Sequence, residues 1–121
     1  MKRFYNEVTA APAEGGYGVL LDGRPIRTPA RAPLTLPTLA LADSVAAEWQ
    51  AQGDSIALQT MPLTGIANAA IDLVRPDPAA FAAPLARYGE SDLLCYRAPE
   101  ADLAAEQAKQ WNPILLWAET R

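Results

Sequence analysis

The sequence has 121 residues, of which 50% are hydrophobic and 20% are charged, with one cysteine and no histidine. A chain of this length can bury a core without disulfides, and the missing histidine excludes, within these residues, imidazole bases and histidine metal ligands. The net charge of −4 without a dense basic run argues against nucleic-acid binding, and no apolar stretch approaches the roughly twenty residues of a membrane span.

The first part of the chain is predicted to form a small antiparallel sheet. β-favouring residues predict a strand from Phe4 to about Ala11 and a partner from Tyr17 to Leu21, joined by a glycine-rich turn. The dipeptide Asp22-Gly23 predicts a two-residue hairpin turn, after which Ile26 to Thr28 returns antiparallel. The prolines that follow favour an edge strand or extended loop, and the alternation at Leu34 and Leu36 predicts a short half-buried strand.

Helical periodicity then dominates. It predicts one helix over residues 38–52 and a second from Pro62 to about Val74, where the prolines at 76 and 78 stop it. Asp77-Pro78 has the cap-then-proline pattern of a third helix, which ends at Gly89. The short apolar run Leu93–Tyr96 fits either a buried strand or a tight helical turn, and we expect the strand.

The last segment predicts two helices, from Glu100 to Trp111 and from Asn112-Pro113 onward. The fold class is therefore α+β: an antiparallel hairpin or small sheet packed with helices over residues 1–90, and the beginning of a helical second domain over residues 91–121. The chain stops without a capping glycine while Trp117 needs cover, so we expect the interior of a helix rather than a natural terminus. The alternative is a short amphipathic tail that folds back on the core.

The residues give little sign of chemistry. The carboxylates are scattered and form no convincing acid–base pair, and the glycine cluster at 15–18 has the pattern of a turn rather than of a phosphate-binding loop. Cys95 lies in an apolar run with no histidine to activate it, so we expect a buried structural thiol rather than a nucleophile. We therefore expect no catalytic residue, no metal, no cofactor and no small-molecule substrate.

Two groups of residues are candidates for binding a partner. Arg24, Arg27 and Arg31 lie around the hairpin and fit an anion or an acidic partner, although a solvated basic edge that discourages strand pairing explains them as well. The tryptophans are most simply core residues, but Trp111 and Trp117 lie where covering residues run out, and tryptophan is enriched at interfaces. The candidates for partner binding are therefore Arg24, Arg27, Trp111 and Trp117.

Several short strings occur in one order and together resemble a known family. The strings are Arg3-Phe4-Tyr5, Leu21 to Pro29, Leu36-Pro37-Thr38, Glu48-Trp49, Met61 to Thr64, Asp92 to Arg97 and Trp111-Asn112-Pro113. They resemble the ATP-twelve chaperone family, the assembly factors of mitochondrial and α-proteobacterial ATP synthase. The similarity runs from about Arg3 to Ala118.

The resemblance implies a non-enzymatic chaperone that holds the free α subunit of the ATP synthase catalytic head until β pairs with it. It also implies an N-terminal α+β domain followed by a helical domain, and a location in the bacterial cytoplasm, or in the mitochondrial matrix for a processed eukaryotic member. The alternative from the residues alone is a small anion-binding or regulatory module that uses Arg24, Arg27 and Arg31.

Overall fold

The computed structural model describes residues 1–121, which divide into two compact units, Met1–Pro78 and Ala79–Arg121. The first unit contains a three-stranded antiparallel sheet in the order β1-β2-β3, formed by Val8–Ala13, Gly16–Leu21 and Arg24–Pro25. Helices follow the sheet along the chain, so the α+β class is confirmed. The division into domains at residue 90 stays a prediction.

The hairpin turn between β2 and β3 is confirmed. Leu21 pairs with Arg24 across the turn, and the two residues between them have positive φ, 48° at Asp22 and 77° at Gly23. A tight turn with these angles matches the twist of the flanking strands. The turn therefore places the two residues that follow it, Arg24 and Pro25, at an edge of the sheet.

The predicted first strand begins later than expected, at Val8 instead of Phe4. The residues before it are extended but bond elsewhere: Tyr5 donates from its hydroxyl to the carbonyl of Trp49, and Arg3 N–H bonds to the carbonyl of Asp54. These two bonds tie residues 3 and 5 to the region that follows the middle of the chain's first helix, at residues 49–54, while no ladder of strand pairing forms before Val8.

The predicted third strand, Ile26 to Thr28, is misplaced, because β3 is Arg24–Pro25, and the predicted short strand at Leu34 and Leu36 is wrong. Beyond Pro25 only single bonds continue the pairing, such as the one from Ile26 N to Val19 O at 3.0 Å. Leu36 forms an isolated bridge with Tyr17 instead of belonging to a strand. The chain crosses close to Gly16 there: a Cβ on that glycine would meet the carbonyl oxygen of Leu36, so only glycine fits.

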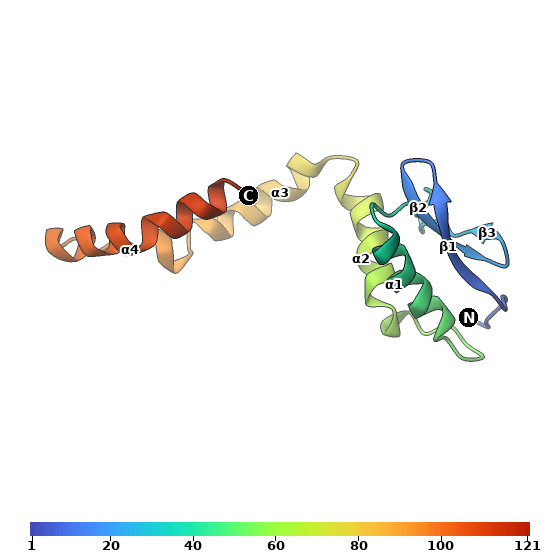
Figure 1. Ribbon diagram of the computed structural model, residues 1–121. Helices are drawn as coiled ribbons and strands as arrows, with labels where there is room; N and C mark the ends of the chain where they lie inside the picture. Colours follow the sequence, from blue (N-terminus) through green and yellow to red (C-terminus); the bar gives the residue numbers. More distant parts are fainter. The chain divides into compact units, whose positions relative to one another are not determined.

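Helix α1, Leu39–Gln50, packs against β1 and β2 on one side and against α2, Pro62–Ala69, on the other (Figure 1). Thr38, predicted as the first residue of the helix, instead caps α1 by accepting a hydrogen bond from Leu41 N at 3.2 Å. The buried positions of α1 follow the i, i+3, i+4 spacing: Ala42, Val45, Ala46 and Trp49. They meet Val19 and Leu21 of β2, and together these side chains form the centre of the core.

The N-terminus of α2 is capped by a side chain from α1. Pro62 has no N–H, and Met61 at the cap position makes no side-chain bond. The Glu48 carboxylate instead accepts from the N–H groups of Leu63 and Thr64, at 2.7 and 2.8 Å, and from the buried Thr64 hydroxyl at 2.8 Å. One residue of α1 thus satisfies the first turn of α2.

The predicted second helix extends from Pro62 to Val74, but only its first part, to Ala69, is α-helical. A π-helical turn, Ala70–Val74, continues it. Asp72 in this turn accepts from the buried Thr28 hydroxyl at 2.6 Å and from Ala30 N at 3.0 Å. The π turn therefore holds the loop that follows β3.

Helix α3, Pro78–Gly89, begins at the last residue of the first unit and otherwise belongs to the second, which also contains α4, Ala101–Glu119. No side chain from residue 79 onward is buried. The predicted strand at Leu93–Tyr96 is wrong: Leu93–Cys95 is a 3₁₀ turn capped by Asp92, which accepts from Leu94 N at 2.9 Å. Cys95 is exposed, so the prediction of a buried thiol is wrong as well.

The predicted break between a fourth and a fifth helix is also wrong, because α4 runs through Pro113 without interruption. Proline there removes the bond to the carbonyl of Lys109, but that residue is exposed, so water can satisfy the carbonyl. None of the helices in the structure is both long and apolar enough to span a bilayer.

Candidate partner-binding site

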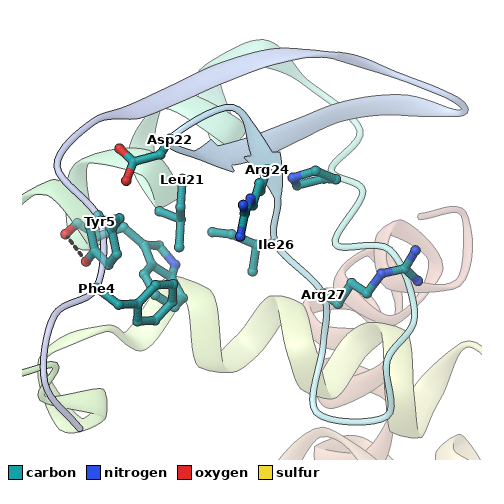
Figure 2. Close-up of a pocket in the computed structure, with 9 residues that line it drawn as sticks. Phe4, Tyr5, Leu21, Asp22, Arg24, Ile26 and Arg27 are labelled. Atoms are coloured by element: carbon teal, nitrogen blue, oxygen red, sulfur yellow. Dashed lines mark hydrogen bonds between the residues drawn. The ribbon is translucent and has the colours of Figure 1, made fainter.

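The first unit has a pocket of about 520 Å³ between the N-terminal segment, the β2–β3 hairpin and the end of α1. We call it the hairpin pocket. Figure 2 shows Phe4 at one end of it, Arg27 at the other and Arg24 between them. Its lining residues are Phe4, Tyr5, Leu21, Asp22, Arg24, Pro25, Ile26, Arg27 and Trp49.

The N-terminal wall is held by Arg3 and Tyr5. Arg3 donates to the carbonyl of Gln52 at 2.6 Å, near the end of α1, and its guanidinium lies 4.6 Å from the centre of the Tyr5 ring. The Tyr5 hydroxyl donates to Trp49 O at 2.7 Å, and burial raises the pKa of Tyr5 above its ordinary value, against the opposing effect of Arg3. Between these two anchored residues, Phe4 is 64% exposed.

Asp22 joins the hairpin to the N-terminal segment. Its carboxylate accepts from the backbone N–H of Glu7 at 2.8 Å and from that of Asn6 at 3.0 Å. The Glu7 bond first, and then the Asn6 bond, hold the pKa of Asp22 below its usual value, with a smaller contribution from Arg24. Asp22 therefore acts as a structural acceptor.

Arg24 and Arg27 both line the hairpin pocket, and both are exposed. Arg27 donates from Nη1 to the carbonyl of Arg31 at 2.9 Å. Arg31 itself does not line the pocket; it occupies a turn with φ of 67°. Two of the three arginines that the sequence grouped therefore share one site.

Trp111 and Trp117 lie in the second unit, on α4. Trp111 is half-buried, with the guanidinium of Arg97 5.5 Å from its ring, whereas Trp117 is 59% exposed. The expectation that the tryptophans are core residues thus holds for Trp49 and not for Trp117.

Sequence reasoning missed Phe4, Pro25 and Ile26 as lining residues. No sequence signal identifies Phe4, because its place on the pocket follows from the anchoring of Arg3 and Tyr5 at the end of α1 and from the edge-to-face contact of its ring with the Tyr5 ring, at 5.4 Å between centroids. Pro25 and Ile26 follow directly from the hairpin turn, because the turn fixes which residues come next at the sheet edge.

Two further carboxylates of the first unit, those of Glu48 and Asp72, have structural roles. Glu48 and Asp72 bond to backbone N–H groups and to threonine hydroxyls of the chain itself. No three side chains among histidine, cysteine, aspartate and glutamate cluster in a way that would hold a metal ion. The lining of the hairpin pocket offers two arginines, one carboxylate and several apolar side chains.

A sequence model of the ATP12 chaperone protein family matches residues 2–119, almost the whole chain. The chain belongs to the ATP12 chaperone family. The match includes both units and every string on which the sequence resemblance rests.

Solved structures of this family resemble the chain closely. Atp12 from Paracoccus denitrificans is 51% identical with a TM-score of 0.76, over 98% of this chain and 52% of that one, and a mutant of the same protein gives the same identity and score. The Atu1473 protein from Agrobacterium tumefaciens is 46% identical with a TM-score of 0.73, over 97% of this chain and 44% of that one. The chain spans about half the length of these relatives.

Proposed function

We propose that this protein is an assembly chaperone that binds the free α subunit of the ATP synthase catalytic head and shields its subunit interface until β pairs with it. The observation that carries the proposal is the family match over residues 2–119. An unassembled subunit exposes a large apolar interface that promotes aggregation, and a protein that covers this interface suppresses aggregation without any bond chemistry. Release then requires only that β competes successfully for the same surface.

The proposal includes action by binding alone, without catalysis or a cofactor. It is supported by the roles of the carboxylates Asp22, Glu48 and Asp72, each of which accepts hydrogen bonds from the chain's own backbone. We propose Arg24, Arg27, Trp111 and Trp117 as partner-binding residues, and the bacterial cytoplasm, or the mitochondrial matrix for a eukaryotic member, as the location. The proposed domains remain residues 1–90 and 91–121.

The test is binding to isolated ATP synthase subunits. The full chain is mixed with α alone, with β alone and with both, and complexes are separated by size-exclusion chromatography while light scattering follows the aggregation of α. We expect a stable complex with α, slower aggregation of α, and loss of the complex when β is added. Capture of β, or of neither subunit, would refute the proposal.

The alternative of a small anion-binding module keeps one specific observation in its favour, because Arg24 and Arg27 line the same pocket. Calorimetry with phosphate and with nucleotides distinguishes the two functions. A chaperone that recognises a protein surface gives no specific heat with these small anions, whereas an anion-binding module does.

A further inference from the structure

The polar groups of the hairpin pocket are unevenly matched. Arg24 and Arg27 supply guanidinium donors, and the one carboxylate in the lining, that of Asp22, already accepts from Asn6 and Glu7. The pocket therefore carries two positive charges and one negative charge in a chain whose net charge is −4. An occupant that complements it has to bring hydrogen-bond acceptors and negative charge.

Trp49 adds a second, independent sign of a missing acceptor. The residue is only 8% exposed and lines the pocket, and its indole Nε1 is buried without any hydrogen-bond partner. A buried donor without a partner costs free energy, and native proteins rarely leave one unpaired. Since this nitrogen is shielded from solvent, an acceptor reaches it only when an occupant displaces part of the wall. The Phe4 ring, which is 64% exposed and packs edge-on against the Tyr5 ring at 5.4 Å between centroids, is one part of that wall.

The pocket also has an apolar side that a free inorganic anion would leave unused. Phe4 is 64% exposed, Pro25 is exposed and Ile26 is half-buried, and all three line the pocket. Figure 2 shows Phe4 and Arg27 at opposite ends with Arg24 between them, so an occupant that uses the whole pocket is elongated. An extended peptide with acidic and apolar side chains has both the shape and the chemistry.

We propose that the hairpin pocket binds an extended acidic segment of the partner protein, with acidic side chains held by Arg24 and by Arg27 and an apolar side chain against Phe4 and Ile26. The identity of the partner as the ATP synthase α subunit rests on the proposed function, whereas the chemistry of the segment rests on the pocket. Arginine forks bind carboxylates through two parallel hydrogen bonds, which fixes the register of the segment as well as its charge.

The test compares two double variants of the full chain that change the net charge equally. R24E/R27E reverses the pocket charges, and R87E/K109E reverses two exposed charges in the second unit. Circular dichroism and thermal unfolding first establish that both variants fold. Binding is then measured to the α subunit, to a blocked peptide of alternating glutamate and leucine, to the same peptide with glutamine in place of glutamate, and to inorganic phosphate.

We expect R24E/R27E to bind α and the glutamate peptide roughly tenfold or more weakly than the unchanged chain, because loss of a paired charge costs binding free energy. R87E/K109E is expected to bind like the unchanged chain, and the glutamine peptide to bind weakly to both. In a ¹⁵N–¹H spectrum the Trp49 indole signal should move when the glutamate peptide is added, while the Trp117 signal, from the second unit, stays in place.

Failure of the inference and failure of the proposed function give different results. If α binds equally to the unchanged chain and to R24E/R27E, the function stands and the inference is overturned. If the α subunit does not bind, but the glutamate peptide binds to the unchanged chain and not to R24E/R27E, the proposed function is refuted and the inference that the pocket binds an acidic segment is supported. Equal binding of the glutamine peptide, phosphate binding as tight as that of the peptide, or a response of Trp117 without Trp49 would each overturn the inference.

Discussion

Replacement of Glu48 by alanine should destabilise the first unit more than removal of any exposed carboxylate on the same helix. Glu48 lies on α1 but accepts three hydrogen bonds from the first turn of α2, at 2.7 to 2.8 Å. Because Pro62 and Met61 provide no side-chain cap, no other side chain of the unit bonds to these N–H groups.

The magnitude follows from the groups left without a partner. Loss of a helix cap costs about 1 kcal/mol, and a buried hydroxyl without a partner costs about 1–3 kcal/mol; Thr64 is only 3% exposed. We therefore expect Glu48→Ala to lose about 2–4 kcal/mol. For a unit of this size the loss lowers the unfolding temperature by at least about 8 °C.

The assay is urea and thermal unfolding followed by circular dichroism. Asp43→Ala is the matched control, since Asp43 is an exposed carboxylate on the same helix. Thr64→Val removes only the hydroxyl bond and is expected to lose about 1 kcal/mol, so its difference from Glu48→Ala isolates the backbone cap. If Glu48→Ala and Asp43→Ala unfold at the same temperature, the capping argument is wrong.

Three further predictions concern the hairpin and the N-terminal segment. The pKa of Asp22 in the folded chain lies below its ordinary value of 3.8, so the charged carboxylate stabilises the fold above pH 3.8, and this stabilisation is lost as the pH falls through the folded pKa. Asp22→Asn, which keeps a residue suited to the turn, should therefore make the free energy of unfolding depend less on pH in the acid range. Tyr5→Phe removes a buried hydrogen bond and should lower the free energy of unfolding in urea by about 1–2 kcal/mol. Because burial raises the pKa of Tyr5 above 10.0, the protonated hydroxyl stabilises the fold until the pH rises through the folded pKa. The variant should therefore lose less stability than the unchanged chain at alkaline pH. Gly16→Ala should lower the free energy of unfolding by more than about 1 kcal/mol, since Gly16 has a φ of 154° and the new methyl group would meet the carbonyl of Leu36. Gly18→Ala is the control, because a methyl group there meets only ordinary contacts. Equal unfolding midpoints for the two variants would contradict the steric argument.

The elements that local sequence determines were predicted well. The apolar spacing of α1 defines that helix without reference to the rest of the chain. Asp22-Gly23 likewise specifies its turn through the positive φ that both residues adopt. In each case the deciding interaction lies within four residues, so the sequence alone contains the answer.

The errors arise where local signals compete or distant partners decide. At Leu93–Tyr96 the apolar run resembles a strand, but Asp92 bonds to the backbone two residues later and stabilises a tight turn. At Pro113 the proline suggested a new helix, yet its neighbours favour helix and the affected carbonyl lies at an exposed residue. Proline therefore marks a helix boundary only when the lost hydrogen bond cannot be replaced.

The hairpin pocket was predicted only in part. The positions of Arg24 and Arg27 beside the turn followed from the sequence, and their shared pocket is consistent with a joint role. Phe4 and Trp49 could not be added, because their contribution depends on bonds between the N-terminal segment and the end of α1, which are 44 residues or more apart. No periodicity or short string reports a contact of that kind.

The bond from Tyr5 to the carbonyl of Trp49 also orders events during synthesis. The hydroxyl of Tyr5 lacks its acceptor, the carbonyl of Trp49, until α1 has left the ribosomal exit tunnel. Until then the N-terminal wall of the pocket has nothing to dock against, and Trp49, which forms part of the floor, is absent. The hairpin pocket of the nascent chain therefore forms only after the whole sheet and α1 have emerged, and the acidic segment proposed to bind there has no complete site before that point.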